Sequence, residues 1–428
     1  MTPTIRAMAW FWQTWLVAVV FIFPIPHTIA LRNLLLLIGL LALLPPLTRA
    51  TRLPLPPALK PAAWGLAAAT AWLLLHSLAV APAPTVALDN LRGDWLQPIL
   101  TAALAAFASS RIGPNRAIQS IIAALLGHML WVFGWQLMSW VDNGMATGWP
   151  VSIIPFGQND YQSSLNGFLL SILVAERLAV QLAGLQVAVI AARSGWVGLA
   201  ISFLADAALR SRNGTVVSVV LLLATTVWIG LRSRRMIFLA FIAIALGSAS
   251  VALDPRWSGL KESLAIGWNS HSQYWLHGNK ALRPPTPSGA VLEESAYARA
   301  AWAHQAVLAI GEHPLGLGFG RDGFGRAMAE KYGYPGMVSS HSGWLDFALA
   351  AGLPGLVLLL LTAGLAMRGG WRQFRQHHDA AGLMFCFLIG GYLLRCLLDG
   401  HFSGWRLGLF AFICGVLIAA MKPAPRQT

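Results

Sequence analysis

A single histidine stands where a polar stretch of the chain meets a long apolar run, in SSHSGWLDFALAAGLPGLVLLL at residues 339–360. The ordinary pKa of an imidazole is near 6.5, which suits His341 to take a proton from a hydroxyl at neutral pH. Capping of the following helix and binding of a lipid head group are the alternatives for a histidine in this position. The arginines that precede it in the sequence favour chemistry.

The first of these arginines lies in an amphipathic segment. Residues 296–310 are typical of a helix that carries Arg299 and Trp302, and Gly311 and Pro314 are expected to end it. A solvated surface position is the alternative for Arg299, and we interpret Arg299 as an anion ligand and Trp302 as a substrate contact.

A glycine-rich turn follows this segment, and it carries Arg321 and Arg326. Glycine runs cradle phosphates where they connect a strand to a helix, but this run follows a helix. We therefore interpret the glycines as a tight structural connection. Arg321 and Arg326 are further candidate anion ligands, with a solvated surface position as the alternative for each.

Arginine and histidine together indicate one kind of reaction. Arginine binds phosphate bidentately and keeps its charge, so it stabilises a phosphate or pyrophosphate leaving group while a histidine takes a proton from an attacking hydroxyl. The sequence contains no HExxH, no paired-cysteine zinc spacing, no P-loop, no G-x-S-x-G and no Asp-x-Asp. We expect a site without metal or cofactor.

The composition defines the elements that must position these residues. Of 428 residues 57% are hydrophobic and 11% charged, against about 25% charged in soluble proteins. Long apolar runs recur throughout, which predicts an all-α polytopic membrane protein surrounded by lipid. The formal charge of +14 does not indicate a nucleic-acid partner, because most Lys and Arg stand in short clusters between the apolar runs and set orientation there.

The apolar runs predict about twelve transmembrane helices in three parts. Residues 1–252 hold spans one to nine, residues 253–342 form a large polar segment that carries part of the active site, and residues 343–428 hold the last three spans and a short tail. Two spans share the region 161–210, where Glu176–Arg177 and residues 193–195 are both possible turns. The expected spans are 9–25, 30–47, 62–81, 95–109, 117–140, two within 161–210, 214–231, 237–252, 343–367, 380–398 and 404–421.

The positive clusters that follow spans two, four, eight, ten and twelve all fall on one side, which the positive-inside rule makes cytoplasmic. Both termini are then cytoplasmic, and residues 253–342 and His341 face the periplasm of a bacterial inner membrane. Arg210 and Arg212 are exceptions on the periplasmic side, as are Arg32 and Arg92. Helix-end snorkelling is the alternative, but a charge at the membrane often faces a cavity or ligand.

Three motifs resemble the family shared by O-antigen ligases, O-antigen polymerases and bacterial protein O-oligosaccharyltransferases. SRNG at 211–214 resembles the start of its core. The stretch at 299–324, which begins with R-x-x-W and ends with HPLGLGFGRDGF, resembles its periplasmic segment. HSGWLDFALAAGLPGL at 341–356 resembles its closing motif. GQNDYQ at 157–162 is a weaker match to an asparagine motif of the family and adds Asn159 as a substrate-binding candidate.

The resemblance implies roles at three of these positions. Arg212 would hold the pyrophosphate of an undecaprenyl-linked glycan donor, Arg299 would neutralise the same leaving group, and His341 would deprotonate or orient the acceptor hydroxyl. Arg210 is a substrate-binding candidate from the charge pattern alone. The reaction would be a metal-independent, inverting glycan transfer.

The acceptor is less closely defined by these motifs. A basic polar segment before His341 favours the phosphorylated lipid A-core of an O-antigen ligase, with the polymerase or the protein-directed enzyme as alternatives. A transporter of lipid-linked glycan is a further alternative, since Arg395 and Asp399 could form a relay within the membrane. The absence of visible internal repeats weakens it.

Overall fold

The structure is a computed structural model that describes residues 3–47, 55–145, 159–209, 211–229, 259–269, 274–278, 283–289, 291–334, 336–400 and 402–421, with a few isolated residues between 234 and 248. Every regular element in these ranges is a helix, and no strand occurs in them. Among the described residues, five helices are long and apolar enough to cross a membrane. The prediction of an all-helical membrane protein is thereby confirmed at the level of class, and the number of twelve spans stays a prediction.

The described helices occupy every expected span except 237–252, most of which lies outside the described residues. Four lie in the polar segment before His341: α11 (Leu260–Trp268), α12 (Tyr274–His277), α13 (Glu294–Glu312) and α14 (Gly323–Tyr332). The others are α1 (Pro3–Ile22), α2 (Ile29–Leu47), α3 (Lys60–Ala79), α4 (Pro84–Leu91), α5 (Gln97–Ser110), α6 (Pro114–Asp142), α7 (Asn159–Ala183), α8 (Ala192–Ala208), α9 (Arg212–Ile229), α15 (Gly343–His377), α16 (Ala380–Leu398) and α17 (Gly404–Ala420), with short turns η1 (Pro57–Leu59), η2 (Arg92–Leu96) and η3 (Leu185–Val187).

The turn between α7 and α8 lies between the two positions that the sequence suggested. Gly184 has a φ of 90° and ends α7, so Glu176 and Arg177 belong to the helix. Both side chains are buried and form an ion pair. Glu176 accepts hydrogen bonds from the amides of Val189 and Ile190 at 3.1 and 3.5 Å. The interpretation of Glu176–Arg177 as a turn was wrong, because the two side chains neutralise each other inside the helix. Glu176 also holds the observed turn in place through its hydrogen bonds to Val189 and Ile190.

The helix that follows His341 is broken inside. Gly352 in α15 has φ 75° and ψ 168°, which only glycine adopts readily, and Pro354 follows it. The backbone groups released by the break find partners, as they must inside a membrane. The amide of Leu353 donates to Pro314 O at 2.9 Å, and Trp72 Nε1 of α3 donates to Ala351 O at 2.9 Å.

The glycine-rich turn fits into this break. A Cβ on Gly316 would lie 2.5 Å from Gly352 N, and one on Gly352 would lie 2.4 Å from Leu315 O. The interpretation of the turn as a tight structural connection agrees with this packing. The turn also anchors α13 and α14, in the polar segment, to the membrane helix α15.

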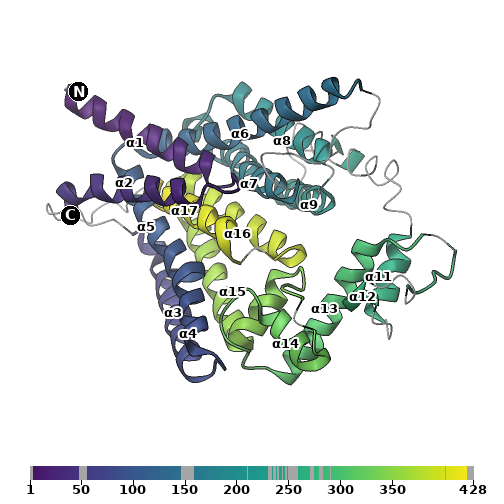
Figure 1. Ribbon diagram of the computed structural model, residues 1–428. Coiled ribbons are helices and arrows are strands. Elements are labelled where there is room, and N and C mark those ends of the chain that lie inside the picture. The colour runs from purple at the N-terminus through teal and green to yellow at the C-terminus, as the bar shows by residue number, and fades with distance from the viewer. Residues whose placement is uncertain are drawn as a thin grey trace.

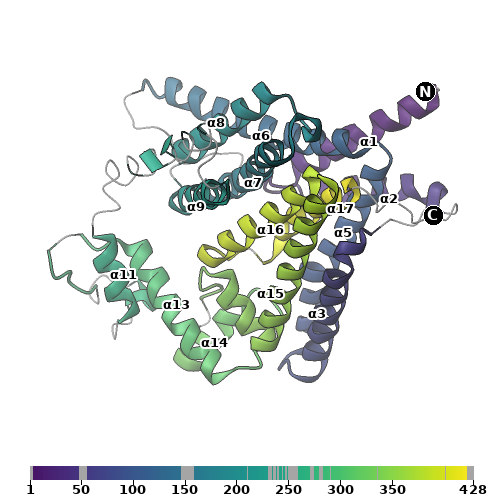
Figure 2. The same ribbon diagram turned by 180° about the vertical axis from the view of Figure 1, so that it is seen from behind.

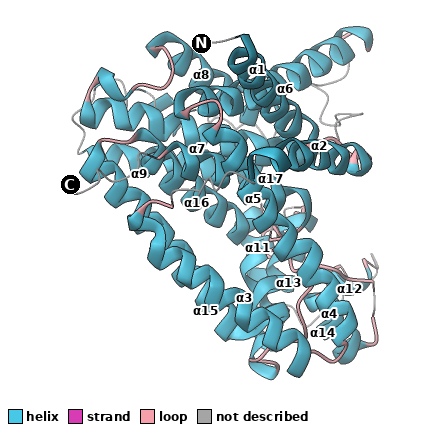
Figure 3. Cartoon of the chain, turned by 90° about the vertical axis from the view of Figure 1, so that its left-hand side faces the viewer, coloured by secondary structure: helices cyan, strands magenta, loops and turns pink. Residues whose placement is uncertain are grey.

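The ends of four helices meet on one side of the bundle. Gly343 N, at the start of α15, donates to Asp399 O just after α16 at 3.1 Å. Asn213 of α9 donates to Leu398 O at 3.3 Å, and Arg395 of α16 donates to Ser163 of α7 at 2.9 Å. In Figures 1 and 2, α11, α12 and α13 extend away from α1 and α2 on this side, while α3 and α15 run alongside each other. Figure 3 shows the helices throughout the described chain.

Candidate active site

A cavity of about 720 Å³ lies between α9 and the end of α16 on one side and α11 and α13 on the other. Arg212, Arg299 and His341 all line it. Much of the remaining wall is apolar, from α9, α11 and α16. Arg299 follows Arg212 by 87 positions in the sequence and His341 follows it by 129, yet all three line one cavity. The cavity has a cationic side and an apolar side.

Arg212 is the first residue of α9, and it reaches the helix that carries Arg299. Its Nη2 lies 3.0 Å from Glu293 Oε1, and its side chain is 19% exposed. The other carboxylate oxygen of Glu293 accepts from Ala296 N at 2.6 Å and so caps the N-terminus of α13. Glu293 therefore joins Arg212 directly to α13.

Arg299 lies in α13, six residues after Glu293, and is more exposed than Arg212, with 37% of its side chain exposed. Its Nη2 is 3.9 Å from Asp399 Oδ1, while Asp399 Oδ2 lies 2.9 Å from Arg395 Nε. Asp399 is thus held between two guanidinium groups. This long contact leaves Arg299 able to turn toward an anion in the cavity.

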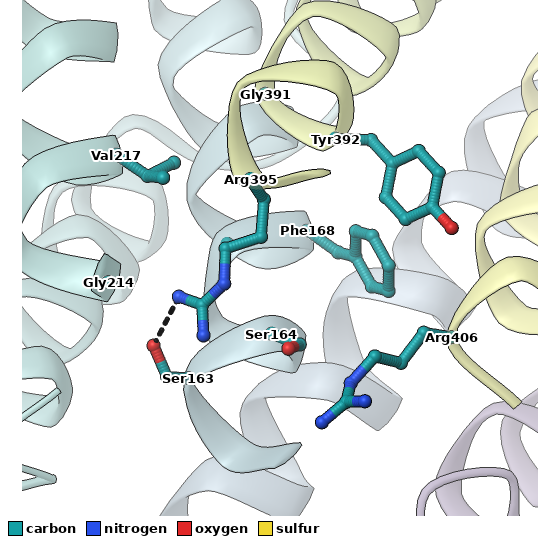
Figure 4. Close-up of a pocket in the computed structure, with 10 residues that line it drawn as sticks. Ser163, Ser164, Phe168, Gly214, Val217, Gly391, Tyr392, Arg395 and Arg406 are labelled. Carbon is teal, nitrogen blue, oxygen red and sulfur yellow. Dashed lines mark hydrogen bonds between the residues drawn. The ribbon is translucent and has the colours of Figure 1, made fainter. Parts of the chain in front are cut away.

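Arg395 continues this network into the bundle. Figure 4 shows it pointing from α16 toward Ser163 of α7, with Arg406 of α17 nearby. Arg406 pairs with Asp160 and lies over the ring of Tyr161, 4.6 Å from its centroid. Arg395 and Asp399 are buried and paired, as charged groups inside a membrane bundle usually are, whereas the side chain of Asp160 is 42% exposed.

The loop that carries His341 is held by one carboxylate. Asp346, in the first turn of α15, accepts from Ser339 Oγ at 2.6 Å and from Ser340 N at 2.8 Å. His341 itself has a φ of 60°, a left-handed conformation that is uncommon for a residue with a side chain. Asp346 and the serines hold that conformation and direct the imidazole into the cavity.

The imidazole of His341 lies flat against the indole of Trp302. Their ring centroids are 5.0 Å apart and the planes differ by 17°. Burial lowers the pKa of His341 below 6.5, and the charge of Arg299 lowers it further, against smaller opposing effects of Asp399 and Asp160. The imidazole is therefore neutral at neutral pH and able to accept a proton.

Two other residues predicted from the sequence, Arg321 and Asn159, do not line this cavity. Arg321 forms a bidentate pair with Asp94 at 2.9 and 2.6 Å. The glycine-rich turn carries Arg321 toward α4, α5 and α17, and its role as a substrate ligand stays a prediction. Asn159 begins α7, and Arg210 lies outside the described residues.

The sequence did not indicate that three acidic residues support the site: Glu293, Asp346 and Asp399. Asp399 was considered only as a partner of Arg395. Glu293 could have been recognised as a helix cap, since it precedes an amphipathic segment. In the part of the chain that the structure describes, no cluster of three or more His, Cys, Asp or Glu side chains is placed to hold a metal ion. Operation without metal stays a prediction.

The fold and this cavity define a helical membrane protein with two arginines and a histidine around a large half-apolar cavity. The family model described as O-antigen ligase matches residues 178–360, in agreement with the resemblance that the sequence motifs indicated. The matched range contains α9, α13, the loop of His341 and the break in α15. The family comprises membrane glycosyltransferases that include O-antigen ligases and polymerases. No curated protein matches the chain.

Proposed function

We propose that this protein is an O-antigen ligase of the bacterial inner membrane. It transfers a glycan from undecaprenyl pyrophosphate to a sugar hydroxyl of lipid A-core on the periplasmic side. The observation that supports this most is the convergence of Arg212, Arg299 and His341 on one cavity. The apolar wall beside them suits the isoprenoid chain of such a donor.

The chemical step is a single in-line displacement. The acceptor hydroxyl oxygen attacks the anomeric carbon of the donor sugar as the bond from that carbon to the pyrophosphate oxygen breaks. The hydroxyl proton passes to the imidazole of His341, whose lowered pKa keeps it unprotonated beforehand. One displacement inverts the anomeric centre, and no carboxylate nucleophile is required.

The arginines stabilise the leaving group. Negative charge grows on the pyrophosphate as the bond breaks, and positioned guanidinium groups stabilise it without a metal ion. Arg212 and Arg299 have carboxylate partners in Glu293 and Asp399, which hold them in place before the donor binds. A pyrophosphate in the cavity then competes with these carboxylates for both guanidinium groups.

The test is a transfer assay with purified protein in detergent and EDTA. Undecaprenyl-pyrophosphate glycan and lipid A-core are the substrates, and wild type is compared with His341→Ala and Arg212→Ala. Lys331→Ala is the matched control, because Lys331 of α14 pairs with Glu312 at the end of α13 and does not line the cavity of His341. Glycosylated lipid A-core from wild type and the control, but not from the other two variants, is expected.

The same assay distinguishes the alternatives. Growth of the glycan on the carrier lipid, with no glycosylated lipid A-core, would make the protein a polymerase. Transfer to neither lipid, with the donor still bound, would contradict the proposed chemistry and favour a transporter.

A further inference from the structure

A second group of cavities surrounds the start of α5, away from the cavity of His341. The largest, which we name the polar chamber, has a volume of about 480 Å³ and lies between α2, α4, α5 and the start of α17. The apolar slot, about 310 Å³, lies between α3, α5, α15, α16 and α17. A smaller connecting cavity of about 200 Å³ lies against the loop of His341.

The three cavities adjoin one another at shared wall residues. The polar chamber and the apolar slot share Pro98, and the connecting cavity shares Asp94 and Arg321 with the polar chamber. The connecting cavity and the apolar slot share Phe402. Residues around the start of α5 therefore line a polar space, an apolar space and a space beside the loop of His341.

The lining of the polar chamber indicates the kind of head group it holds. Two arginines face two carboxylates there, so the charges balance and a polyanion gains little. The remaining polar groups are amides and a hydroxyl, which offer donors and acceptors together, as vicinal hydroxyls of a sugar require. The charged residues are Arg32, Arg321, Asp89 and Asp94, and the uncharged polar ones are Asn33, Asn90, Gln97 and Thr101.

Arg32 is one of the positive charges that the sequence placed on the disfavoured side of the membrane. Its Nη1 donates to Phe23 O at 3.3 Å, and its guanidinium lies 5.5 Å from the ring centroid of Phe23. Its Nε is buried and has no hydrogen-bond partner among the described residues. A guanidinium at this position whose Nε–H group donates no hydrogen bond to the described residues is consistent with a ligand in the polar chamber.

The local helix geometry separates the polar and apolar spaces. η2, at Arg92–Leu96, is a π-helical turn between α4 and α5, a rare feature that is often found at functional sites. It places Asp94 on the polar chamber and its neighbour Trp95 in the wall of the apolar slot. A lipid with its head in the chamber and a chain in the slot fits this division.

We propose that the polar chamber and the apolar slot bind a lipid with a hydroxyl-rich saccharide head. That this lipid is the acceptor of the transfer reaction rests on the proposed function, whereas the binding site is argued from the cavities alone. Asp94 carries the connection to the chemistry: it pairs with Arg321, accepts from Gly404 N at 2.9 Å, and lines the connecting cavity beside Ser339 and Gly343. Donor and acceptor then occupy separate cavities on either side of the His341 loop.

The test measures binding separately from transfer, in nanodiscs of phosphatidylcholine. Asn33→Ala and Gln97→Ala remove polar groups that line the chamber and leave the Arg321–Asp94 pair untouched. The variants are expected to weaken lipid A-core binding about fivefold each and to leave binding of undecaprenyl-pyrophosphate glycan unchanged. Arg212→Ala is expected to weaken binding of undecaprenyl-pyrophosphate glycan and to leave lipid A-core binding unchanged.

Several outcomes would overturn the proposal. Unchanged lipid A-core binding, or equal weakening of both lipids, would do so. Loss of phosphatidylglycerol binding in place of lipid A-core binding would identify a phospholipid site instead. If wild type transfers nothing but its lipid A-core binding still depends on Asn33 and Gln97, the site stands and the ligase proposal fails.

A second measurement needs no variant. Lipid A-core with a photoreactive group on its outer sugars is crosslinked to the wild-type protein, and the labelled peptides are mapped. Labelling of α2, α4 or the start of α5 is expected. Labelling confined to α11 and α13 would place this lipid in the cavity of His341 and contradict the proposal.

Discussion

The indole of Trp302 covers one face of the His341 imidazole, with the ring centroids 5.0 Å apart and the planes at 17°. Trp302 is itself fixed by a hydrogen bond from its Nε1 to Trp275 O at 3.3 Å. The stacking restricts rotation of the imidazole about its own bonds. Trp302 is therefore a positioning residue for the group that we propose as the base.

Replacement of Trp302 tests this role. Stacked aromatic pairs contribute about 0.5–1.5 kcal/mol, so Trp302→Ala is expected to lower kcat for transfer by up to about tenfold. Trp302→Phe keeps a stacking ring and should restore most of the rate. Equal losses in the two variants would show that the indole acts by some means other than stacking.

Arg299→Lys tests the need for a guanidinium. Lysine keeps the charge but cannot bind a pyrophosphate bidentately, so kcat is expected to fall by about 10²-fold. The measurement is steady-state transfer at saturating donor. Lys261→Arg, at an exposed position on α11, is the matched control and should leave the rate within about twofold. A full rate in Arg299→Lys would mean that only charge matters there.

Asp399→Asn is expected to move the pH dependence. Asp399 raises the pKa of His341, while burial and Arg299 lower it. Loss of the carboxylate therefore lowers this pKa, and the acid limb of the kcat/KM profile, below pH 6.5 in wild type, shifts to lower pH. Asp160→Asn should shift it less, because Asp160 has the smaller effect. A reduced rate with an unmoved acid limb would point to a purely structural role for Asp399.

Gly352→Ala tests the break in α15. A φ of 75° disfavours alanine, and its Cβ would lie 2.4 Å from Leu315 O. The free energy of unfolding is expected to fall by at least about 2 kcal/mol, seen as a lower Tm in detergent. Gly364→Ala in the same helix is the control, since nothing lies within 4 Å of its Cβ position. Similar Tm values for both variants would contradict the strained break.

Hydropathy and motif spacing in the sequence were enough to predict the helical membrane class and the candidate site residues. Long apolar runs can form only helices in lipid, so the helical membrane class followed from composition. The motifs led to Arg212, Arg299 and His341, and the amphipathic segment predicted α13, because helix periodicity and reactive side chains are local properties of the sequence.

Only the tertiary structure decided which of these residues meet. Arg299 and Arg321 stand 22 residues apart and look equivalent in the sequence, yet one lines the cavity of His341 and the other pairs with Asp94. Partners such as Glu293 for Arg212 come from distant segments, and their pairing depends on how helices pack. The glycine-rich turn packs against the break at Gly352 and so fixes those positions. Glycine permits the break, but which backbone groups pack against it is decided by the tertiary structure.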